Sequence, residues 1–254
     1  MENIIEINNL TFKYDNKNSL FEGLSVSIEK GKITTLLGKN GCGKSTLIKI
    51  LTKNLNYNSG SIKLEGKELN SYSLKELASI LAVVYQKNET PREITVYDMV
   101  SFARLPYQNI FFYKPNANDI EKIEFALEKT SLQAYKDKRV DELSGGQLQR
   151  VYIAMALAQN TDIIILDEPT TFLDIKYQKS IMQLVRDLNK SLGITVIMVL
   201  HDINQALAYS DNIIALLDGK VIKNDQAANF FNETLLNRLY DADIKIEDGK
   251  VISW

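Results

Sequence analysis

The amino-acid sequence predicts an α/β fold built on a mainly parallel sheet, with an antiparallel β subdomain and a helical subdomain. Apolar runs that are continuous rather than alternating are typical of strands buried on both faces, as in a parallel sheet. Amphipathic helical patterns, such as the apolar positions Leu47, Ile50 and Leu51, lie between several of these runs, and this alternation indicates an α/β protein. The five runs cover residues 33–37, 81–85, 163–166, 194–200 and 213–217.

Two regions interrupt this alternation, and a third follows it. Residues 3–30 and 61–69 contain short alternating segments, which predict antiparallel strands beside the main sheet. Residues 88–142 hold three of the four prolines and lack strong strand signals, so we expect a mainly helical insertion. The tail, from about residue 225, has a helical pattern followed by two short strand-like pieces that end at Trp254.

Composition excludes several classes of protein. The 254 residues are 45% hydrophobic and 24% charged, which is ordinary for a soluble globular chain. A net charge of −2 gives no basic excess that would indicate nucleic acid as a partner. One cysteine and one histidine exclude an intrachain disulfide and a zinc site of the usual kind. With no signal peptide and no apolar run near the ~20 residues of a membrane span, we expect an intracellular protein that would reach a membrane through a partner.

A glycine-rich stretch, LLGKNGCGKST, separates the first apolar run from a helical pattern. Residues 38–45 match the phosphate-binding pattern G-x-x-x-x-G-K-[ST], called the P-loop. Glycines let the backbone aim several N–H groups at one phosphate, and the helix start adds its positive dipole. We expect Lys44 to reach the β- and γ-phosphates, Ser45 to ligate Mg²⁺, and Cys42 to be a small filler rather than a redox switch. The residues expected to bind nucleotide here are Gly38, Lys39, Asn40, Gly41, Cys42, Gly43, Lys44, Ser45 and Thr46.

The run IIILDEP, residues 163–169, is a strand pattern that ends in two acids. Asp167 is placed to hold Mg²⁺ through its water shell, and Glu168 to polarise an attacking water. Alone, these acids would be read as the exposed end of a core strand, but a P-loop in the same chain favours the catalytic interpretation. The two motifs together predict a P-loop NTPase core that uses ATP and Mg²⁺.

The stretch LSGGQLQR, residues 143–150, begins another helical pattern. Ser144 is a typical N-cap residue, and Gly145 and Gly146 expose backbone N–H groups, so this helix start is a second candidate anion site. An ordinary helix cap has the same sequence signal. Two phosphate-binding helix starts in one chain suggest a head-to-tail dimer, in which the two sites enclose one nucleotide.

With these motifs in this order, the chain resembles the ATPase subunit of an ATP-binding-cassette (ABC) transporter, from about residue 4 to about residue 221. LSGGQ matches the signature that separates this family from other P-loop proteins. The resemblance implies that Tyr14 stacks on adenine, that Gln86 senses Mg²⁺ and the γ-phosphate, and that His201 contacts the γ-phosphate. It also implies that TTFLD, which ends at Asp174, crosses the dimer interface.

The resemblance gives a single domain, residues 1–254, with a nucleotide-binding core lobe (1–87 and 161–254) and a helical lobe (88–160). Each implied role has a plainer alternative: Tyr14 as a packing residue, Gln86 as an exposed strand end and His201 as a core histidine. The implied catalytic residues are Glu168, His201, Lys44 and Gln86. The implied metal site contains Ser45, Gln86 and Asp167, and Ser144, Gly145, Gly146, Gln147, Asp174 and Tyr14 join the P-loop in binding nucleotide.

Longer segments indicate a subfamily. NGCGKSTLIKIL, AMALAQNTDIIILDEPTTFLDIKYQ and VLHDINQALAYSD are similar to importer ATPases for iron(III)–siderophore complexes and to relatives that carry haem or cobalamin. MVSFARLPYQN resembles the V-x-x-G-R-x-P segment of those importers, beside the groove for the permease's coupling helix. Lys39, Ala103 and Leu148 depart from the usual proline, glycine and basic residue, and none of them removes a reacting group. Apolar residues here form either a docking surface or the core of the helical lobe: Phe102, Leu105, Phe111 and Phe112.

We therefore expect the ATP-hydrolysing subunit of an importer for iron(III)–siderophore-type chelates. It would act at the cytoplasmic face of the cell membrane, with integral permease subunits, a second ATPase copy and, indirectly, an extracytoplasmic binding protein as partners. An importer of cobalamin or haem is the alternative, and an exporter is less favoured. A soluble ABC protein of DNA repair or translation is disfavoured, because the insertion is short and the chain holds a single cassette.

Overall fold

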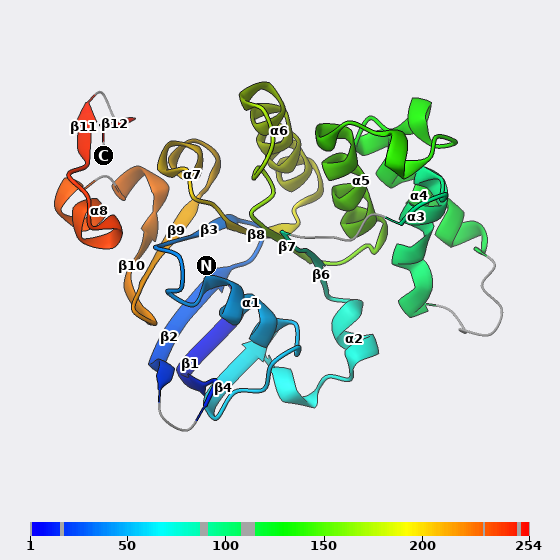
Figure 1. Cartoon of the computed structure of the whole chain (residues 1–254). Coiled ribbons are helices and arrows are strands. Elements are labelled where there is room, and N and C mark those ends of the chain that lie inside the picture. The colour runs from blue at the N-terminus through cyan, green and yellow to red at the C-terminus, as the bar shows by residue number, and fades with distance from the viewer. Residues whose placement is uncertain are drawn as a thin grey trace. The chain divides into compact units, whose positions relative to one another are not determined.

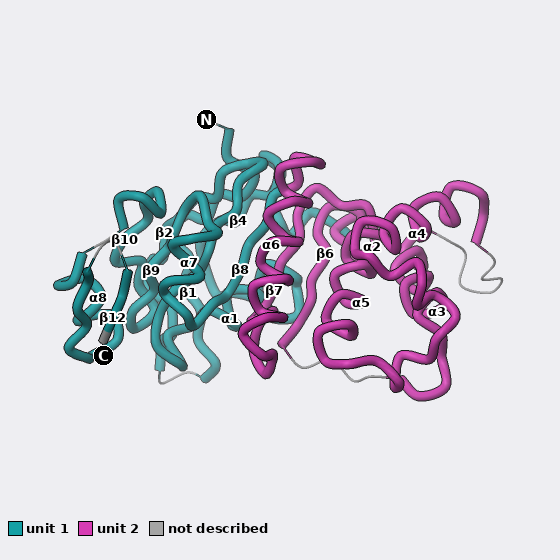
Figure 2. The backbone as a smooth tube through the Cα atoms, turned by 90° about the horizontal axis from the view of Figure 1, so that it is seen from above, with its two compact units in different colours: residues 1–73, 195–254 teal, residues 74–194 magenta. Residues whose placement is uncertain are grey.

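The computed structural model describes residues 2–15, 18–86, 91–107, 115–230, 232–247 and 250–253. The chain divides into two compact units (Figure 2). Unit 1 comprises Met1–Ser73 and Thr195–Trp254, and unit 2 comprises Leu74–Ile194. Unit 2 thus contains two parallel strands as well as the helical segment. The expected lobes, residues 1–87 with 161–254 and residues 88–160, follow function rather than compactness, and they stay a prediction.

Unit 1 contains an antiparallel sheet and four strands of a mainly parallel one. The antiparallel order is β2-β1-β4-β5, and in the other sheet β10, β9, β3 and β8 are neighbours in that order (Figure 1). β3 pairs in parallel with both β8 and β9, whereas β10 returns antiparallel to β9. Its strands are β1 (Asn3–Lys13), β2 (Ser19–Glu29), β3 (Ile33–Leu37), β4 (Ser59–Leu64), β5 (Lys67–Glu68), β8 (Thr195–Val199), β9 (Asn212–Leu217), β10 (Lys220–Gln226), β11 (Lys245–Glu247) and β12 (Lys250–Ser253). Its helices are α1 (Lys44–Leu51), α7 (Ile203–Tyr209) and α8 (Glu233–Tyr240), with short 3-10 turns at Leu69–Ser71 and Ala227–Asn229.

Burial explains the two kinds of strand in unit 1. Every residue of β3 and of β8 is buried, as the continuous apolar runs predict. In β1 and β2, buried and accessible residues partly alternate, which fits a sheet with one packed face. β10 was not expected from its polar sequence. The signal for it is the turn at Asp218 and Gly219, with φ angles of 48° and 72°, because an Asp-Gly pair with positive φ favours a tight hairpin.

Unit 2 combines two parallel strands with a group of helices. β6 and β7 pair in parallel, with Leu81 opposite Ile163 and Val84 opposite Leu166. α6 buries one face, through residues such as Ile181 and Leu188, as its spacing predicts. Its elements are α2 (Leu74–Ala78), β6 (Leu81–Val84), α3 (Val96–Ser101), α4 (Ala117–Lys129), α5 (Gly145–Ala158), β7 (Ile163–Asp167) and α6 (Ile175–Leu192), with 3-10 turns at Phe102–Tyr107, Gln133–Tyr135 and Val140–Glu142.

The predicted fold class is therefore confirmed: a parallel-strand core, an antiparallel sheet and a helical segment are all present. The tail also contains the expected helix, α8, and two short strands, β11 and β12. Within the ranges that the structure describes, no helix is both long and apolar enough to cross a membrane.

Candidate functional site

The P-loop leaves β3 and turns into α1 through three glycines with positive φ. Gly38, Gly41 and Gly43 have φ angles of 154°, 82° and 111°, which L side chains rarely adopt. A Cβ atom on Gly38 would lie 2.2 Å from the carbonyl oxygen of Leu216. One on Gly43 would lie 2.5 Å from the Phe21 ring. Space as well as backbone conformation thus requires glycine at both ends of the loop.

Lys44, the first residue of α1, is only 6% exposed and lies against the P-loop backbone. Its Nζ atom donates to the carbonyl oxygens of Gly38, at 2.7 Å, and of Lys39, at 2.9 Å. It also lies 3.8 Å from the Cys42 sulfur. These contacts satisfy a cation that would otherwise be costly to bury. The Cys42 side chain is itself buried inside the loop, which supports its interpretation as a filler.

The start of α1 has the features of an anion site. Among the described residues no side chain caps this helix, and its first turn contains no acidic residue. The first N–H groups are therefore left to a ligand, and the helix dipole favours a negative one. Ser45 is exposed at this position, so a phosphate group and its Mg²⁺ ion could reach its hydroxyl.

Tyr14 lies beside the same helix start. Its hydroxyl is 2.8 Å from Oγ1 of Thr46, and its ring meets the Phe12 ring edge-on, with centroids 4.8 Å apart. The side chain is nevertheless 63% exposed. A ring that is oriented by two contacts and left open on one face suits stacking better than packing in a core.

His201 follows β8 at the edge from which the P-loop leaves β3. Leu36 and Val199 are partners in these parallel strands, so the carboxyl ends of both strands meet at one edge, where ligands bind in such sheets. His201 is exposed, which argues against a core histidine. The next residue, Asp202, caps α7 by accepting from the amide of Gln205 at 3.0 Å.

In unit 2, the structure joins Gln86 directly to Glu168. Gln86 follows β6 and Glu168 follows β7, its parallel neighbour, and Nε2 of Gln86 donates to Oε2 of Glu168. Oγ1 of Thr171 donates to the same oxygen at 3.0 Å. The sequence reasoning named the glutamine and the glutamate, but it placed Thr171 only within the TTFLD segment and did not connect it with Glu168, three residues before it.

The two acids at the end of β7 have different surroundings. Asp167 is 7% exposed, within the strand. Glu168 is half-buried and has a φ angle of 55°, an uncommon conformation for a non-glycine residue that is frequent at functional sites. Carboxylate and hydroxyl oxygens are ligands that Mg²⁺ accepts. No group of three His, Cys, Asp or Glu side chains in the described ranges could hold a metal by itself.

The LSGGQ segment begins α5 with a reciprocal cap. Oγ of Ser144 accepts from the amide of Gln147 at 3.4 Å, and the amide of Ser144 donates to Oε1 of Gln147 at 3.0 Å. A Cβ atom on Gly146 would lie 2.5 Å from the Tyr177 ring, whereas one on Gly145 would make only ordinary contact. Gly146 is thus needed for packing, and the role of this helix start in binding nucleotide stays a prediction.

The TTFLD segment between β7 and α6 presents large apolar side chains to solvent. Phe172 is 86% exposed and Ile175 is 84% exposed. Asp174, between them, occupies the N-cap position of α6, and among the described residues its side chain makes no capping hydrogen bond. Neighbouring apolar side chains this exposed often mark an interaction surface.

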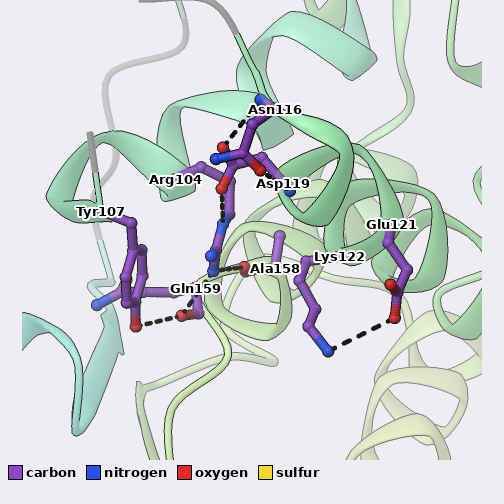
Figure 3. A network of polar contacts seen from close by, with 8 residues as sticks. All are labelled: Arg104, Tyr107, Asn116, Asp119, Glu121, Lys122, Ala158 and Gln159. Carbon is purple, nitrogen blue, oxygen red and sulfur yellow. Dashed lines mark hydrogen bonds and ion pairs between the residues drawn. The ribbon is translucent and has the colours of Figure 1, made fainter. Parts of the chain in front are cut away.

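The ARLP segment, in the 3-10 turn that follows α3, is fixed by a buried ion pair (Figure 3). Nε of Arg104 donates to Oδ1 of Asp119 at 2.9 Å, and both side chains are almost fully buried. The guanidinium also donates to the carbonyl oxygens of Ala158 and Gln159. Tyr107 stacks on it, 4.0 Å from ring centroid to Cζ. A buried charge with all these partners holds its segment in one conformation.

This rigid segment borders an apolar cavity of about 430 Å³ within unit 2. Phe102 and Leu105 are 42% and 40% exposed, so both lie at the surface rather than in the core. Ala103 is buried, whereas Phe111 and Phe112 lie outside the described residues. The cavity is lined by Val83, Val84, Pro91, Met99, Phe102, Ala103, Pro106, Tyr152, Met155, Ala156 and Gln159.

Comparison with known proteins identifies the family. A family model described as ABC transporter matches residues 21–171. The iron(3+)-hydroxamate import ATP-binding protein FhuC of Bacillus subtilis is 43% identical over 227 residues, which are 89% of this chain and 84% of that protein. The petrobactin import ATP-binding protein YclP of the same species is 40% identical over 96% of this chain and 95% of its own. The chain therefore belongs to the ABC transporter family and is an ABC-type ATPase.

A solved structure supports the same assignment. A dimeric ATP-binding cassette in a post-hydrolysis state, bound to ADP and Pi, superimposes with a TM-score of 0.73 and 30% identity, covering 89% of this chain and all of that one. The resemblance stated from the motifs is thus confirmed. The individual site residues are brought together as two groups, the P-loop with Tyr14 and His201 in unit 1 and Gln86 with Asp167 and Glu168 in unit 2, and their separate roles are proposals.

Proposed function

We propose that this ATPase powers the import of iron(III)–siderophore-type chelates through a membrane permease. The observation that carries the proposal is the similarity, over most of the chain, to ATP-binding proteins named for iron(3+)-hydroxamate and petrobactin import. An ATPase that does not bind cargo still has to fit its permease, so likeness over the whole chain is informative about the transporter that it serves.

In the proposed reaction, the residues of unit 1 bind ATP. The N–H groups at the start of α1 and the Lys44 ammonium hold the phosphates, and Tyr14 stacks on the adenine. Ser45 would ligate Mg²⁺, which neutralises phosphate charge when it is bound. His201 contacts the γ-phosphate.

Hydrolysis depends on the carboxylate of Glu168. Gln86 and Thr171 both donate to its Oε2 atom, which orients the carboxylate that would accept a proton from an attacking water. If Gln86 released the carboxylate, Glu168 would lose one of these two donors. The contact thus offers a way to change how the carboxylate is held during the reaction cycle.

A second copy of the chain completes the site in this proposal. Ser144, Gly145, Gly146 and Gln147 would face the nucleotide held by the other copy, and Asp174 would lie at the contact. The exposed Phe172 and Ile175 support an interface at TTFLD, as does the dimeric structural relative. ATP favours the closed pair by binding it more tightly than the open one, and hydrolysis removes that preference.

The permease would dock at the apolar cavity beside the ARLP segment. Its lining, together with the exposed Phe102, suits an amphipathic helix that inserts an apolar face. The Arg104–Asp119 pair keeps this surface rigid before the partner arrives. Docking there would hold the protein at the cytoplasmic face of the membrane, below an extracytoplasmic binding protein that delivers the chelate.

The test is iron-limited growth of a deletion strain on single defined iron sources. Wild type should restore growth on a ferric siderophore, whereas Glu168→Gln should not. Phe102→Glu should also fail and should lose co-purification with the permease, whereas Ile120→Glu, at a similarly exposed apolar residue of α4 (42% and 44%), should behave as wild type. Normal growth of the deletion strain on every siderophore, together with a defect on cobalamin or haem, would overturn the proposed cargo.

A further inference from the structure

α8 brings a tyrosine from the C-terminal part of the chain to the P-loop. Leu236 and Leu239 are fully buried and anchor the helix on unit 1. The helix ends at Asp241, which has a φ angle of 55° and whose amide donates to the carbonyl oxygen of Asn237 at 2.8 Å. The position of Tyr240, the last residue of α8, is therefore fixed by packing on one side and by a helix cap on the other.

The Tyr240 hydroxyl is buried beside two functional segments of unit 1. Its neighbours include Gly38 and Cys42 of the P-loop and Asp202, which follows His201. Burial, and to a lesser extent the Cys42 sulfur, raises the pKa of this phenol far above its ordinary value, so the group is a neutral O–H donor at physiological pH. The nearby Gly38 amide opposes this shift in pKa without reaching hydrogen-bond geometry.

This hydroxyl lacks a hydrogen-bond partner among the described residues. A buried polar group without a partner is unfavourable, so a loop conformation that supplied one would be stabilised. The carbonyl oxygen of Gly38 accepts from Lys44. A buried donor without an acceptor thus lies near a P-loop residue whose carbonyl oxygen the lysine occupies.

We propose that Tyr240 is a positioning residue of the ATPase, whose O–H donates to the Gly38 carbonyl when Lys44 turns from it to nucleotide phosphate. The exchange adds one hydrogen bond: the lysine exchanges a carbonyl for a phosphate oxygen, and the tyrosine replaces the lysine at Gly38. Tyr240 therefore stabilises the nucleotide-bound P-loop relative to the free one. The proposal depends on nucleotide binding, a property of the family, and not on the cargo.

A second contact joins the same two segments but is weaker. Oδ2 of Asp241 lies 3.5 Å from Nζ of Lys39, the residue that replaces the usual proline of the loop. Both side chains are accessible to water, so the pair is screened. It confirms that the end of α8 adjoins the P-loop, and the proposed effect rests on the buried hydroxyl.

The test is Tyr240→Phe in the full chain, with MgADP affinity measured by calorimetry and the melting temperature measured without nucleotide. We expect the Kd to rise about three- to tenfold, the effect of one hydrogen bond. The melting temperature should stay the same or rise, because a buried hydroxyl without a partner has been removed. Tyr209→Phe, at a half-buried tyrosine that ends α7, should change neither quantity.

Two outcomes overturn the proposal. An unchanged Kd would mean that the hydroxyl does not act on the loop, and a raised Kd with a lowered melting temperature would mean that it only supports the fold. Asp241→Gly separates the hydroxyl from the ion pair, because glycine adopts the same positive φ without a carboxylate. Its Kd should stay within about twofold of wild type, and a larger rise than that of Tyr240→Phe would assign the effect to charge.

Discussion

The P-loop lysine of unit 1 is enclosed, whereas the signature serine and the TTFLD phenylalanine of unit 2 lie at the surface. Lys44 is 6% exposed and bonded to its own loop, but Ser144 is exposed at its helix start and Phe172 is 86% exposed. The P-loop therefore needs only its own unit to take its shape. The signature and TTFLD segments are shaped for something that approaches from outside, which is why we assign them to a partner copy.

The motifs of the two units also reach positive φ differently. In the P-loop, positive φ falls on glycines, where it costs little. In unit 2 it falls on Glu168 and Phe172, at 55° and 65°, where side chains make it costly. At these loop positions the first unit uses backbone N–H groups, so glycine can occupy them. The second unit needs particular side chains at strained positions, and the hydrogen bonds to Glu168 hold one of them.

The largest expected effect is a loss of ATP hydrolysis without a loss of ATP binding. Glu168→Gln should lower ATP hydrolysis about 100- to 10,000-fold, because the amide cannot accept the proton of the attacking water. ATP affinity should stay near wild type, since unit 1 is unchanged. Phosphate release and calorimetry measure the two quantities, and Glu142→Gln, an exposed acid of unit 2, is the control. A parallel loss of ATP affinity would contradict the division of labour between the units.

A change at the P-loop of unit 1 should instead weaken ATP binding. Lys44→Ala removes a buried ammonium that would contact phosphate, and we expect ATP affinity to fall about 10- to 100-fold. Lys49→Ala, at an exposed lysine of the same helix, should have no effect. Calorimetry with ATP on both variants checks this, and unchanged affinity of Lys44→Ala would refute the P-loop assignment.

A smaller effect is expected at the outward face of unit 2. Phe172→Asp in a Glu168→Gln background should weaken ATP-dependent dimerisation about tenfold, since one buried aromatic side chain at an interface is worth this much. The melting temperature of the monomer should not change. Leu74→Asp, another apolar residue of unit 2 that is 68% exposed, is the control. If sizing chromatography gave equal dimer fractions for both variants, TTFLD would not lie at the interface.

The fold was largely predictable because its signals are local. β3, β7 and β8 are continuous apolar runs, and the glycines of the P-loop report a backbone requirement that the Cβ distances bear out. β10 was missed because its residues are polar, and only the Asp218–Gly219 turn indicated it. Such an edge strand is specified by its turn and its partner more than by hydrophobic pattern.

The contacts between motifs were less predictable. The residues Gln86 and Glu168 were named separately, but their hydrogen bond depends on the register of β6 against β7. The burial of the Arg104–Asp119 pair and the approach of Tyr240 to the P-loop join residues far apart in sequence. Pairings of this kind follow from tertiary packing, for which a single sequence has no local signal.

The smallest expected effect on ATP affinity concerns Tyr14 of unit 1, whose ring and hydroxyl can be tested separately. Tyr14→Ala should weaken ATP binding about five- to tenfold, because stacking of a base on an aromatic ring is lost. Tyr14→Phe should stay within about twofold, because the hydrogen bond between the Tyr14 and Thr46 hydroxyls involves an exposed tyrosine and water can replace it. GTP and ATP should lose affinity equally, since stacking reads no base edge. If Tyr14→Phe weakened binding as much as Tyr14→Ala, the tyrosine would act by holding Thr46 and the start of α1, and the P-loop would depend on a side chain outside it.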